Sequence, residues 1–325
     1  MKIQRLVFPD KGRCEIEDIT LDERRDDSEL LLKTRVSLIS AGTELAMFTR
    51  SHRGFDDPNN RYAKYPFPPG YLNVAEVVEG NSKIKTGTRV FSPRFHQTHF
   101  KAKADEVIVL PDGLSDEHAT FYGLASIAVT AVHVAPVTIG GQVVVIGMGI
   151  VGNLCAQFYN ITGAGIVVGV DLSEKRLARA TLCGIPKTFN TGQRPLSECC
   201  KELGERGAEW IIEAVGNARA IAEALKCAPR KGKVVLLGSP RTVMEIDPYN
   251  DIHRGGVQVI GAHGNAVDPS QRRFENTLLM NWLRSGKLIV DPLITQRMAF
   301  HQAAQAYAGL RDKPDEYMGV MLTYA

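Results

Sequence analysis

The stretch that most constrains the fold of this chain runs from residue 142 to residue 171. Gln142–Ile146 is a short run, apolar after its first residue and rich in β-branched side chains, which predicts a buried strand. Gly147, Gly149 and Gly152 follow at once, in the spacing G-x-G-x-x-G. This order predicts a strand, a tight turn and then a helix.

The three glycines have separate roles in a turn that binds a dinucleotide. Gly147 permits the sharp turn, Gly149 lets the backbone approach a pyrophosphate, and Gly152 lets the helix pack closely on the sheet. The helix N-terminus, with its free N–H groups and partial positive charge, favours an anion there. A second apolar run, residues 165–170, ends in Asp171, whose carboxylate can accept hydrogen bonds from both hydroxyls of an adenosine ribose. The alternative is a packing turn in an ordinary αβ unit.

Asp171 also predicts which dinucleotide binds. A carboxylate at this point repels and crowds the 2′-phosphate of NADP, so we expect NAD. Arg176, with Lys175 beside it, could hold a phosphate, but behind Asp171 we interpret both as contacts to the adenosine side or as a solvated helix face.

Charge and hydropathy exclude several classes of partner. The 325 residues include 39 basic and 36 acidic side chains, a net charge of +3, and no basic block is interleaved with aromatic residues. Nucleic acid is therefore not an expected partner. No apolar run approaches the roughly 20 residues needed to span a bilayer. The first residues, MKIQRLVFPDKG, lack the apolar core of a signal peptide and predict a first strand, so we expect a cytoplasmic protein with no membrane partner.

The order of predicted elements indicates two domains and a return. Residues 1–117 show short strand-like runs divided by Gly, Pro and Asn/Asp clusters, typical of a mostly β domain. A helix is expected over residues 115–134, and strands alternate with helices through a second domain, residues 118–264, which predicts a doubly wound parallel sheet. Residues 265–325 end in an apolar strand that needs an open sheet edge, so we expect them to return to the first domain. Residues 50–70, polar and aromatic, are expected to form an exposed loop over a cleft.

Seven pieces in this order resemble the medium-chain dehydrogenase/reductase superfamily, whose members have a GroES-like catalytic domain, a Rossmann domain and a C-terminal return. They are AGTE at 41–44, GY at 70–71, KTGTRV at 85–90, LPDGLS at 110–115, the glycine turn with Asp171, EAVG at 213–216 and KGKVVLLG at 231–238. Within the superfamily, the SAGTE and GYLNVAEVVE pieces are similar to the group of bacteriochlorophyllide hydroxyethyl dehydrogenases and polyol-, sugar- and threonine-dehydrogenase-like proteins. The resemblance implies further cofactor contacts at Ile150, Val151, Val215, Gly216, Gly238, Ser239, Ala262, His263 and Ser126.

The chain departs from this family at the metal sites. Zinc members place a Cys, a His and a third ligand where this sequence has Ala41, Tyr71 followed by Leu72, and Tyr122. Zinc needs thiolate, imidazole or carboxylate ligands, and these positions offer none. The lobe that holds a structural zinc is also absent, because residues 94–103 contain no Cys. We therefore expect no metal.

Without zinc, hydrogen-bond donors must hold the substrate oxygen during hydride transfer. Thr43 matches the family hydroxyl that bonds this oxygen and relays its proton, although a turn-forming Thr is the alternative. Tyr71 stands where a zinc-ligand His would point into the cleft. It either donates to a carbonyl oxygen or fills the vacated metal site, and an unperturbed Tyr, with a pKa near 10, is a poor base.

Other polar residues near the predicted cleft are further candidates. Arg94 and His96 fall where the substrate-pocket wall of the family begins, and His96 is a candidate general base, with exposure on a loop as the alternative. Glu44 is expected to be a supporting or structural carboxylate. Tyr122, with Ser126, either lines the nicotinamide side or packs in the core.

The sequence as a whole predicts a zinc-independent NAD(H)-dependent oxidoreductase that interconverts a secondary alcohol and a ketone. A polar substrate, such as a polyol, cyclitol or sugar, fits the polar candidates. One alternative is a quinone or enoyl reductase, although family members of that kind generally use NADPH. The other is a non-catalytic NAD-binding sensor module. The resemblance implies a homodimer or homotetramer.

Overall fold

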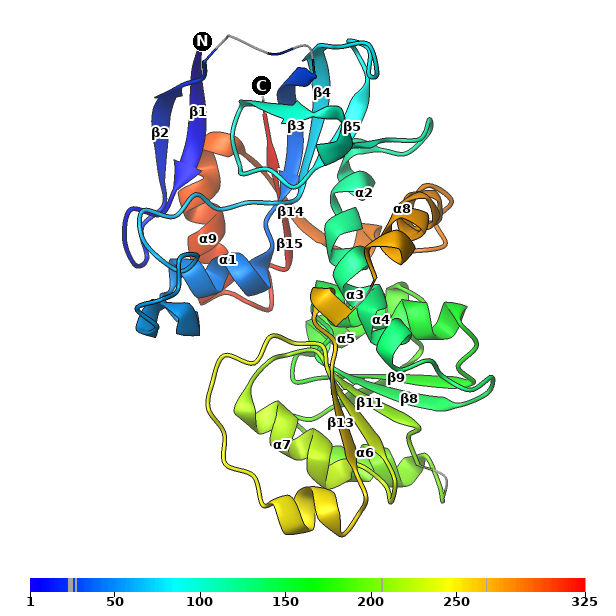
Figure 1. Ribbon diagram of the computed structural model, residues 1–325. Coiled ribbons are helices and arrows are strands. Elements are labelled where there is room, and N and C mark those ends of the chain that lie inside the picture. Colours follow the sequence, from blue (N-terminus) through cyan, green and yellow to red (C-terminus); the bar gives the residue numbers. More distant parts are fainter. Residues whose placement is uncertain (23–25, 27, 206, 267, 325) are drawn as a thin grey trace. The chain divides into compact units, whose positions relative to one another are not determined.

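The computed structural model describes the chain except residues 23–25, 27, 206, 267 and 325, and the side chains of 265 and 269–273. It divides into two compact units. Unit 1 joins Met1–Gly123 to Asn276–Ala325, and unit 2 is Leu124–Glu275. Figure 1 labels most of the helices and strands of both units.

The divisions lie at 123/124 and 275/276, not at the predicted 117/118 and 264/265. The first shift arises because helix α2 (Asp116–Thr120) contacts strands β3 and β4 of unit 1. Helix α3 (Tyr122–Val134) then carries the chain into unit 2. The second division falls within helix α8 (Pro269–Arg284).

Unit 2 is a six-stranded sheet in the order β10-β9-β8-β11-β12-β13, and every neighbouring pair is parallel. Helices follow the strands, as predicted for a doubly wound sheet. The strands are β8 (Gln142–Ile146), β9 (Ile166–Asp171), β10 (Lys187–Asn190), β11 (Trp210–Glu213), β12 (Lys233–Leu236) and β13 (Gln258–Gly261). The helices are α4 (Ile150–Ile161), α5 (Glu174–Leu182), α6 (Leu196–Glu202), α7 (Ala218–Cys227) and the short turns η3 (Pro248–His253) and η4 (Gly264–Ala266).

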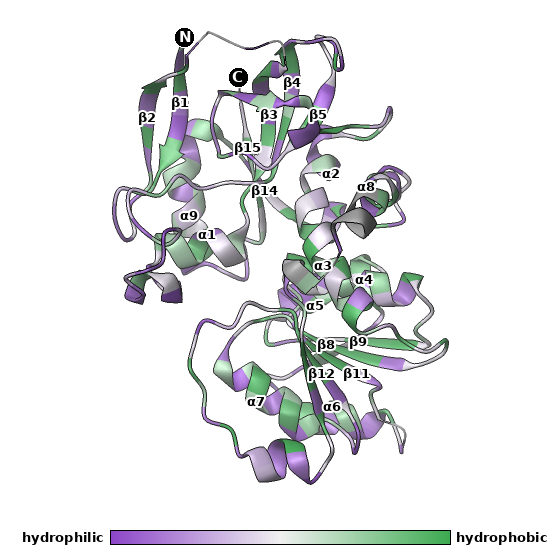
Figure 2. Ribbon diagram, viewed as in Figure 1, coloured by the Kyte–Doolittle hydropathy of each residue, from purple (hydrophilic) through white to green (hydrophobic). Residues whose placement is uncertain are grey.

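The central strands of unit 2 are apolar along their length because helices cover both faces of the sheet. One face packs with α6 and α7 in a cluster that includes Val144, Ile211 and Leu225. Helix α4 lies on the other side (Figure 1). Figure 2 colours much of β8, β9 and β11 as hydrophobic. The buried sheet holds the ends of β8 and β9 side by side, where Ile146 pairs with Val170.

Unit 1 is built on a mostly antiparallel sheet in the order β14-β15-β3-β4-β5-β7, with β6 paired to β3. A separate pair, β1 and β2, is antiparallel. The strands are β1 (Lys2–Val7), β2 (Glu15–Thr20), β3 (Glu29–Leu38), β4 (Asn73–Glu79), β5 (Arg89–Ser92), β6 (His99–Lys103), β7 (Ile108–Val109), β14 (Ile294–Ala299) and β15 (Gly319–Thr323). Helices and short turns are α1 (Ala41–Phe48), η1 (Arg53–Asp56), η2 (Ala104–Glu106), η5 (Asp291–Leu293), η6 (Phe300–Gln302) and α9 (Ala303–Asp312).

The end of the chain returns to unit 1, as predicted. Strand β15 pairs antiparallel with β3, with Met321 opposite Leu38. It thereby covers the edge of β3 that would otherwise be unpaired. Helix α9 packs in the same core as α1, where Tyr307 stacks on Phe48 with ring centroids 5.5 Å apart.

Two predicted elements are wrong in detail. The helix expected over 115–134 is broken at Phe121 into α2 and α3. Among the strand-like runs of residues 1–117, the run at 104–110 was expected to be one strand. It is the short turn η2 followed by the two-residue β7, because the Glu106 side chain accepts from the Lys103 N–H and folds the backbone there.

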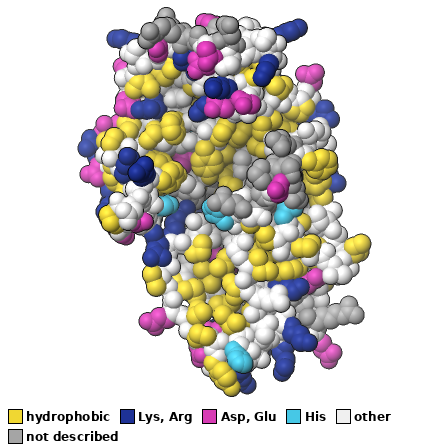
Figure 3. Space-filling model, viewed as in Figure 1, with side chains coloured by type: hydrophobic (Ala, Val, Ile, Leu, Met, Phe, Trp, Pro, Cys, Tyr) yellow, Lys and Arg dark blue, Asp and Glu magenta, His cyan; other side chains and the backbone are white. Residues whose placement is uncertain are grey.

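None of the helices in the described part of the chain is long and apolar enough to cross a bilayer. On the face drawn in Figure 3, acidic and basic side chains are interspersed, with no broad area of one sign.

Candidate functional site

The glycine turn after β8 has the geometry that its spacing predicts. Gly147 has φ 95°, a left-handed conformation that side chains disfavour. A Cβ on Gly152 would lie 1.8 Å from the Gly147 carbonyl oxygen, so α4 can pack this closely only with glycine there. A Cβ on Gly149 would meet nothing within 4 Å, so the chain leaves open space where a pyrophosphate is expected. Gly149 is also the N-cap of α4 and supplies no side-chain cap for the helix.

Asp171 lies at the end of β9, beside this turn. Its Oδ2 accepts from the Met148 N–H at 2.7 Å, and its Oδ1 accepts from the Ser173 N–H at 2.9 Å. The Arg176 Nη1 atom is 3.8 Å from Asp171 Oδ2. The carboxylate therefore holds the glycine turn as well as standing where a ribose is expected.

Two further loops of unit 2 pack against the turn. A Cβ on Gly147 would lie 2.7 Å from Val215 Cγ2, and one on Gly238 would lie 2.4 Å from the Gly216 nitrogen. A Cβ on Gly216 would lie 2.5 Å from the Ser239 carbonyl oxygen. The structure thus brings the predicted residues of three strand ends together.

Glu213 organises the second of these loops and is a residue that the cofactor prediction missed. It is fully buried, and its Oε1 accepts from the Val215 N–H at 2.7 Å and the Gly216 N–H at 2.8 Å. Burial raises the pKa of this carboxyl, and the two backbone hydrogen bonds offset part of that rise. The sequence signal that could have identified Glu213 was its position as the first residue of the EAVG piece.

These residues fit a dinucleotide: an open helix N-terminus for phosphates and a carboxylate for ribose. Ile150 is buried in α4, Val151 is half-buried, Ala262 is buried after β13, His263 is exposed and Ser126 is half-buried in α3. Contacts of these five to a cofactor stay predictions.

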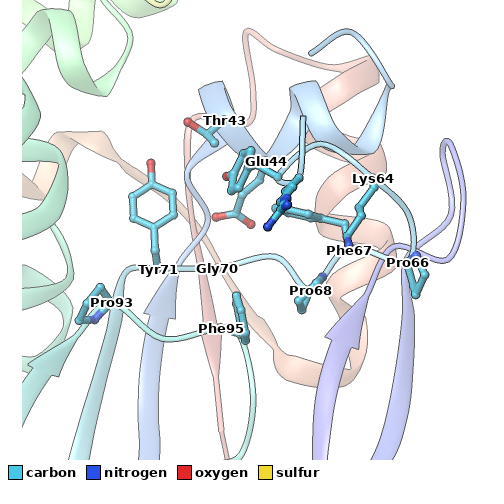
Figure 4. A pocket seen from close by; sticks show the side chains of 12 residues that line it. Thr43, Glu44, Lys64, Pro66, Phe67, Pro68, Gly70, Tyr71, Pro93 and Phe95 are labelled. Carbon is cyan, nitrogen blue, oxygen red and sulfur yellow. The ribbon is translucent and has the colours of Figure 1, made fainter. Parts of the chain in front are cut away.

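A cavity of about 440 Å³ lies within unit 1 (Figure 4). The loop of residues 50–70, predicted to cover a cleft, contributes much of its wall. The polar lining residues are Thr43, Glu44, Arg61, Tyr62, Lys64 and Tyr71. The others are Pro66, Phe67, Pro68, Gly70, Pro93 and Phe95.

Thr43 and Tyr71 meet at one side of this cavity. Figure 4 shows their hydroxyls pointing toward one another, Thr43 from the first turn of α1 and Tyr71 from the segment before β4. The Tyr71 phenol hydrogen-bonds with the Ser40 hydroxyl. Burial raises the pKa of the Tyr71 phenol, the Ser40 and Thr43 side chains lower it in part, and the nearby Glu44 raises it further. The phenol therefore keeps its proton at neutral pH and is a hydrogen-bond donor in the resting protein.

Glu44 lines the cavity, yet its oxygens are held by three donors behind the wall. The Ser40 N–H donates to Oε1 at 2.8 Å, and the Tyr307 hydroxyl donates to Oε2. His96 Nε2 lies 3.1 Å from the same Oε2, and because an ionised carboxylate only accepts, the imidazole donates. Burial and the Glu44 charge raise the pKa of Tyr307 well above its ordinary value. These contacts are those of a structural carboxylate, and the supporting role expected of Glu44 stays a prediction.

His96 does not fit the role of general base. It is fully buried, it is absent from the cavity lining, and its Nδ1 lies 2.7 Å from the Ser37 hydroxyl. Exposure on a loop, the alternative, is wrong as well. Ser37 continues the network to the Tyr324 hydroxyl at 2.9 Å. Sequence spacing gave no signal for this network, because its members lie up to 287 residues apart.

Arg94 and Tyr122 also lie away from the cavity wall. Arg94 Nη2 pairs with Glu106 Oε2 at 2.5 Å. Tyr122 is buried against Phe91 with ring centroids 4.9 Å apart, and its hydroxyl bonds Asn276. The core-packing alternative for Tyr122 therefore holds within unit 1.

The wall prediction at 94–96 missed by one residue. Pro93 and Phe95 line the cavity, while Arg94 and His96 face elsewhere. Successive side chains of an extended segment point to opposite sides, so a shift of one residue exchanges the lining and the buried sets.

The residues at the family metal positions do not fit zinc. Ala41 has no donor atom, the Tyr122 hydroxyl is bonded to Asn276, and the Tyr71 phenol keeps its proton. Within the described residues, no group of three His, Cys, Asp or Glu is placed to hold a metal ion.

Comparison with known proteins shows which families this chain is similar to. Residues 150–283 match the family model described as zinc-binding dehydrogenase. The chain is 28% identical over 229 residues to L-threonine 3-dehydrogenase of Serratia proteamaculans (strain 568), a match that covers 70% of this chain and 64% of that protein. It is 22% identical over 343 residues to D-xylulose reductase of Saccharomyces cerevisiae, covering 94% and 93% of the two chains.

A solved structure shows the same fold. The crystal structure of galactitol-1-phosphate dehydrogenase from Escherichia coli superposes with a TM-score of 0.83 at 20% sequence identity, covering 98% of this chain and 99% of that one. The first relative is matched over less than two thirds of its length. The match over residues 150–283 and the sequence similarity confirm the predicted resemblance of this chain to the zinc-binding dehydrogenases of the medium-chain dehydrogenase/reductase superfamily.

Proposed function

We propose that this chain is an NAD(H)-dependent oxidoreductase that interconverts a secondary alcohol and a ketone on a polar, hydroxylated substrate, without zinc. The observation that carries the proposal is the pair of hydroxyls, Thr43 and Tyr71, which point toward one another at the wall of a 440 Å³ cavity. A cavity of this size suits a small molecule.

A bound nicotinamide would supply the hydride donor or acceptor for the reacting carbon. The chain's contribution would be to hold the cofactor. The open N-terminus of α4 would receive the pyrophosphate, and Asp171 would accept from the ribose hydroxyls. Asp171 also disfavours the 2′-phosphate of NADP, which is why the proposal names NAD.

Thr43 and Tyr71 hold the substrate oxygen. In ketone reduction, Tyr71 donates a hydrogen bond to the carbonyl oxygen and releases its proton to it, while Thr43 fixes the direction of approach. The Ser40 hydroxyl, bonded to the same phenol, is placed to stabilise the phenolate that remains. The raised pKa of Tyr71 favours recovery of its proton. Two neutral donors thus take the part that a cation would have.

The substitutions Thr43→Val and Tyr71→Phe test this assignment, because each keeps shape and deletes one hydroxyl. We expect each to lower turnover about 100-fold with little change in NADH affinity, the typical effect of losing one oxyanion donor. The matched controls are Thr49→Val and Tyr65→Phe, which delete hydroxyls bonded to backbone carbonyls in unit 1 and do not line the cavity.

The assay follows NADH oxidation over a panel of ketones, ketoses, cyclic keto-polyols and quinones. Turnover restricted to quinones or enones, with NADPH preferred, would establish the reductase alternative. NADH binding with no turnover on the panel would indicate a sensor module. Parental rates in both variants on a true substrate would make the pair structural.

Zinc independence has its own measurement. We expect elemental analysis of the purified protein to find no stoichiometric zinc and chelators to leave its rate unchanged, since Ala41, Tyr71 and Tyr122 do not offer zinc ligands. One zinc per chain, lost together with activity, would overturn this part of the proposal.

We also propose a homodimer or homotetramer joined through β13. This strand is the last of the unit 2 sheet order, and Val259 on it is 42% exposed. Light scattering should show an assembly that Val259→Lys weakens, whereas a monomeric parent protein would refute the proposal.

A further inference from the structure

Two basic side chains line the cavity and were not among the predicted site residues. Arg61 and Lys64 both belong to the loop of residues 50–70 and both are exposed. Figure 4 shows Lys64 on the side of the cavity away from Tyr71. The cavity therefore has hydroxyls at one side and cations at another.

These two cations lack the partners that nearby arginines have. Arg50, on the same loop, lies 3.9 Å from Asp56, and Arg94, beside the wall, is paired with Glu106. Within the described part of the chain, no carboxylate lies in ion-pair distance of Arg61 or Lys64.

The one acid in the wall forms no ion pair with either cation. The hydrogen bonds of Glu44 go to Ser40, His96 and Tyr307. Two cations against one carboxylate leave the cavity lining with a net positive charge, which attracts an anion. A neutral polyol would leave both unused.

We propose that the substrate carries an oxyanion group, a carboxylate or a phosphate ester, which Arg61 and Lys64 bind while its alcohol or ketone carbon lies at Thr43 and Tyr71. This inference rests on the proposed function for the reacting end of the molecule. It narrows the substrate class from polar hydroxylated compounds to acidic ones.

The chemistry of the two side chains suits this task. The Arg61 guanidinium presents a planar fork that matches two oxygens of a carboxylate or phosphate, and the Lys64 ammonium adds a compact charge. Between the two ends, Phe67, Pro68 and Phe95 provide an apolar wall for the carbon chain.

The test compares three substrates of equal carbon number: a ketose, its phosphate ester and a keto sugar acid. We expect the parent protein with NADH to prefer one or both anionic members in kcat/KM. Arg61→Gln and Lys64→Gln should each reduce kcat/KM on the anionic substrate by about 10- to 100-fold, the effect of losing a charge-assisted hydrogen bond, and change the neutral ketose less than about twofold. The matched control is Lys83→Gln, an exposed lysine of unit 1 that does not line the cavity.

The phosphate ester, the keto sugar acid and a binding probe together show whether the bound oxyanion is a phosphate or a carboxylate. Inorganic phosphate, titrated by calorimetry, should bind the parent protein and lose affinity in both variants and with added salt if the group is a phosphate. Preference for the keto sugar acid, with malonate bound better than phosphate, would identify a carboxylate.

Failure of this inference is distinguishable from failure of the proposed function. Equal rates on neutral and anionic ketoses, unchanged in both variants, would refute the anion site and leave the oxidoreductase standing. Phosphate or malonate binding that depends on Arg61 and Lys64, with no ketone reduced, would support the anion site and refute the oxidoreductase. If the protein neither bound phosphate or malonate nor preferred an anionic substrate, the anion site would be refuted.

Discussion

Replacing Asp171 by Asn tests the cofactor site at the residue that most determines its selectivity. The carboxylate accepts from the Met148 and Ser173 N–H groups at 2.7 and 2.9 Å, so it supports the turn that receives the pyrophosphate. Asp171→Ala would strip acceptors from two backbone donors, at about 1–3 kcal/mol each. Asn removes the charge and keeps one oxygen acceptor, so only one of the two backbone donors loses its partner, and thermal denaturation measures that cost separately from the effect on the cofactor.

The expected magnitude follows from the lost charge. Hydrogen bonds to charged groups contribute about 1.5–3 kcal/mol, against about 1 kcal/mol for neutral ones. With two ribose hydroxyls expected at the carboxylate, the Asn variant should bind NADH about 10- to 100-fold more weakly. NADPH should bind better than to the parent protein, because repulsion of its 2′-phosphate is gone and the Arg176 guanidinium no longer faces an acid at 3.8 Å.

The assay is a fluorescence titration with NADH and NADPH, alongside thermal denaturation. Asp247→Asn is the matched control: Asp247 accepts from the backbone N–H groups of Tyr249 and Asn250 in unit 2, outside the glycine turn. The control should keep the parental NADH affinity. An Asp171 variant that retains its fold and binds NADH as the parent does would refute the assignment, as would equal NADH and NADPH affinities in the parent.

Three further predictions concern packing and charge. Gly152→Ala should unfold or strongly destabilise unit 2 in thermal denaturation, because its Cβ would lie 1.8 Å from a backbone oxygen, whereas Gly149→Ala, in open space, should fold and weaken NADH binding in a titration. Burial raises the pKa of the Glu213 carboxyl, so ionising it opposes folding. In urea titrations, the unfolding free energy of the parent should therefore fall relative to that of Glu213→Gln as pH rises from about 4.5 through the folded pKa. Arg297 lowers the pKa of Glu117, so Glu117→Gln should reduce the unfolding free energy by less than about 1 kcal/mol at pH 7, a difference that disappears as pH falls below the folded pKa.

The parts of the fold that could be predicted are those with a strong local pattern. Gln142–Ile146 matches the predicted strand residue for residue, because a strand buried on both faces is a continuous apolar run. Strands β2 and β10 have no such pattern, because they are short and partly exposed, and β2 reads EIEDIT, with acids where a buried strand would be apolar. Their pairing is decided by neighbours distant in sequence.

The site was predictable only where a motif orders its residues. The glycine turn and Asp171 lie within one stretch of chain, and Thr43 and Tyr71 came from the family pattern. Arg61 and Lys64 were not found, since a loop has no periodicity that tells which side chains face inward. Arg94 and His96 were wrongly placed in the cavity wall for the same reason: the sequence does not show which alternate side chains of this extended segment face the cavity.

The buried network around Glu44 explains why the C-terminal return belongs to the construction of the site. Tyr307 on α9 donates to the Glu44 carboxylate, and Tyr324, just after β15, reaches His96 through Ser37. A buried carboxylate is tolerated only with its acceptors satisfied, so the segment 276–325 supplies a donor that the first 123 residues lack at this point. The first turn of α1, which carries both Glu44 and Thr43, is thereby held in place from behind. The hydroxyl at the cavity wall thus depends on a residue more than 260 positions later in the chain.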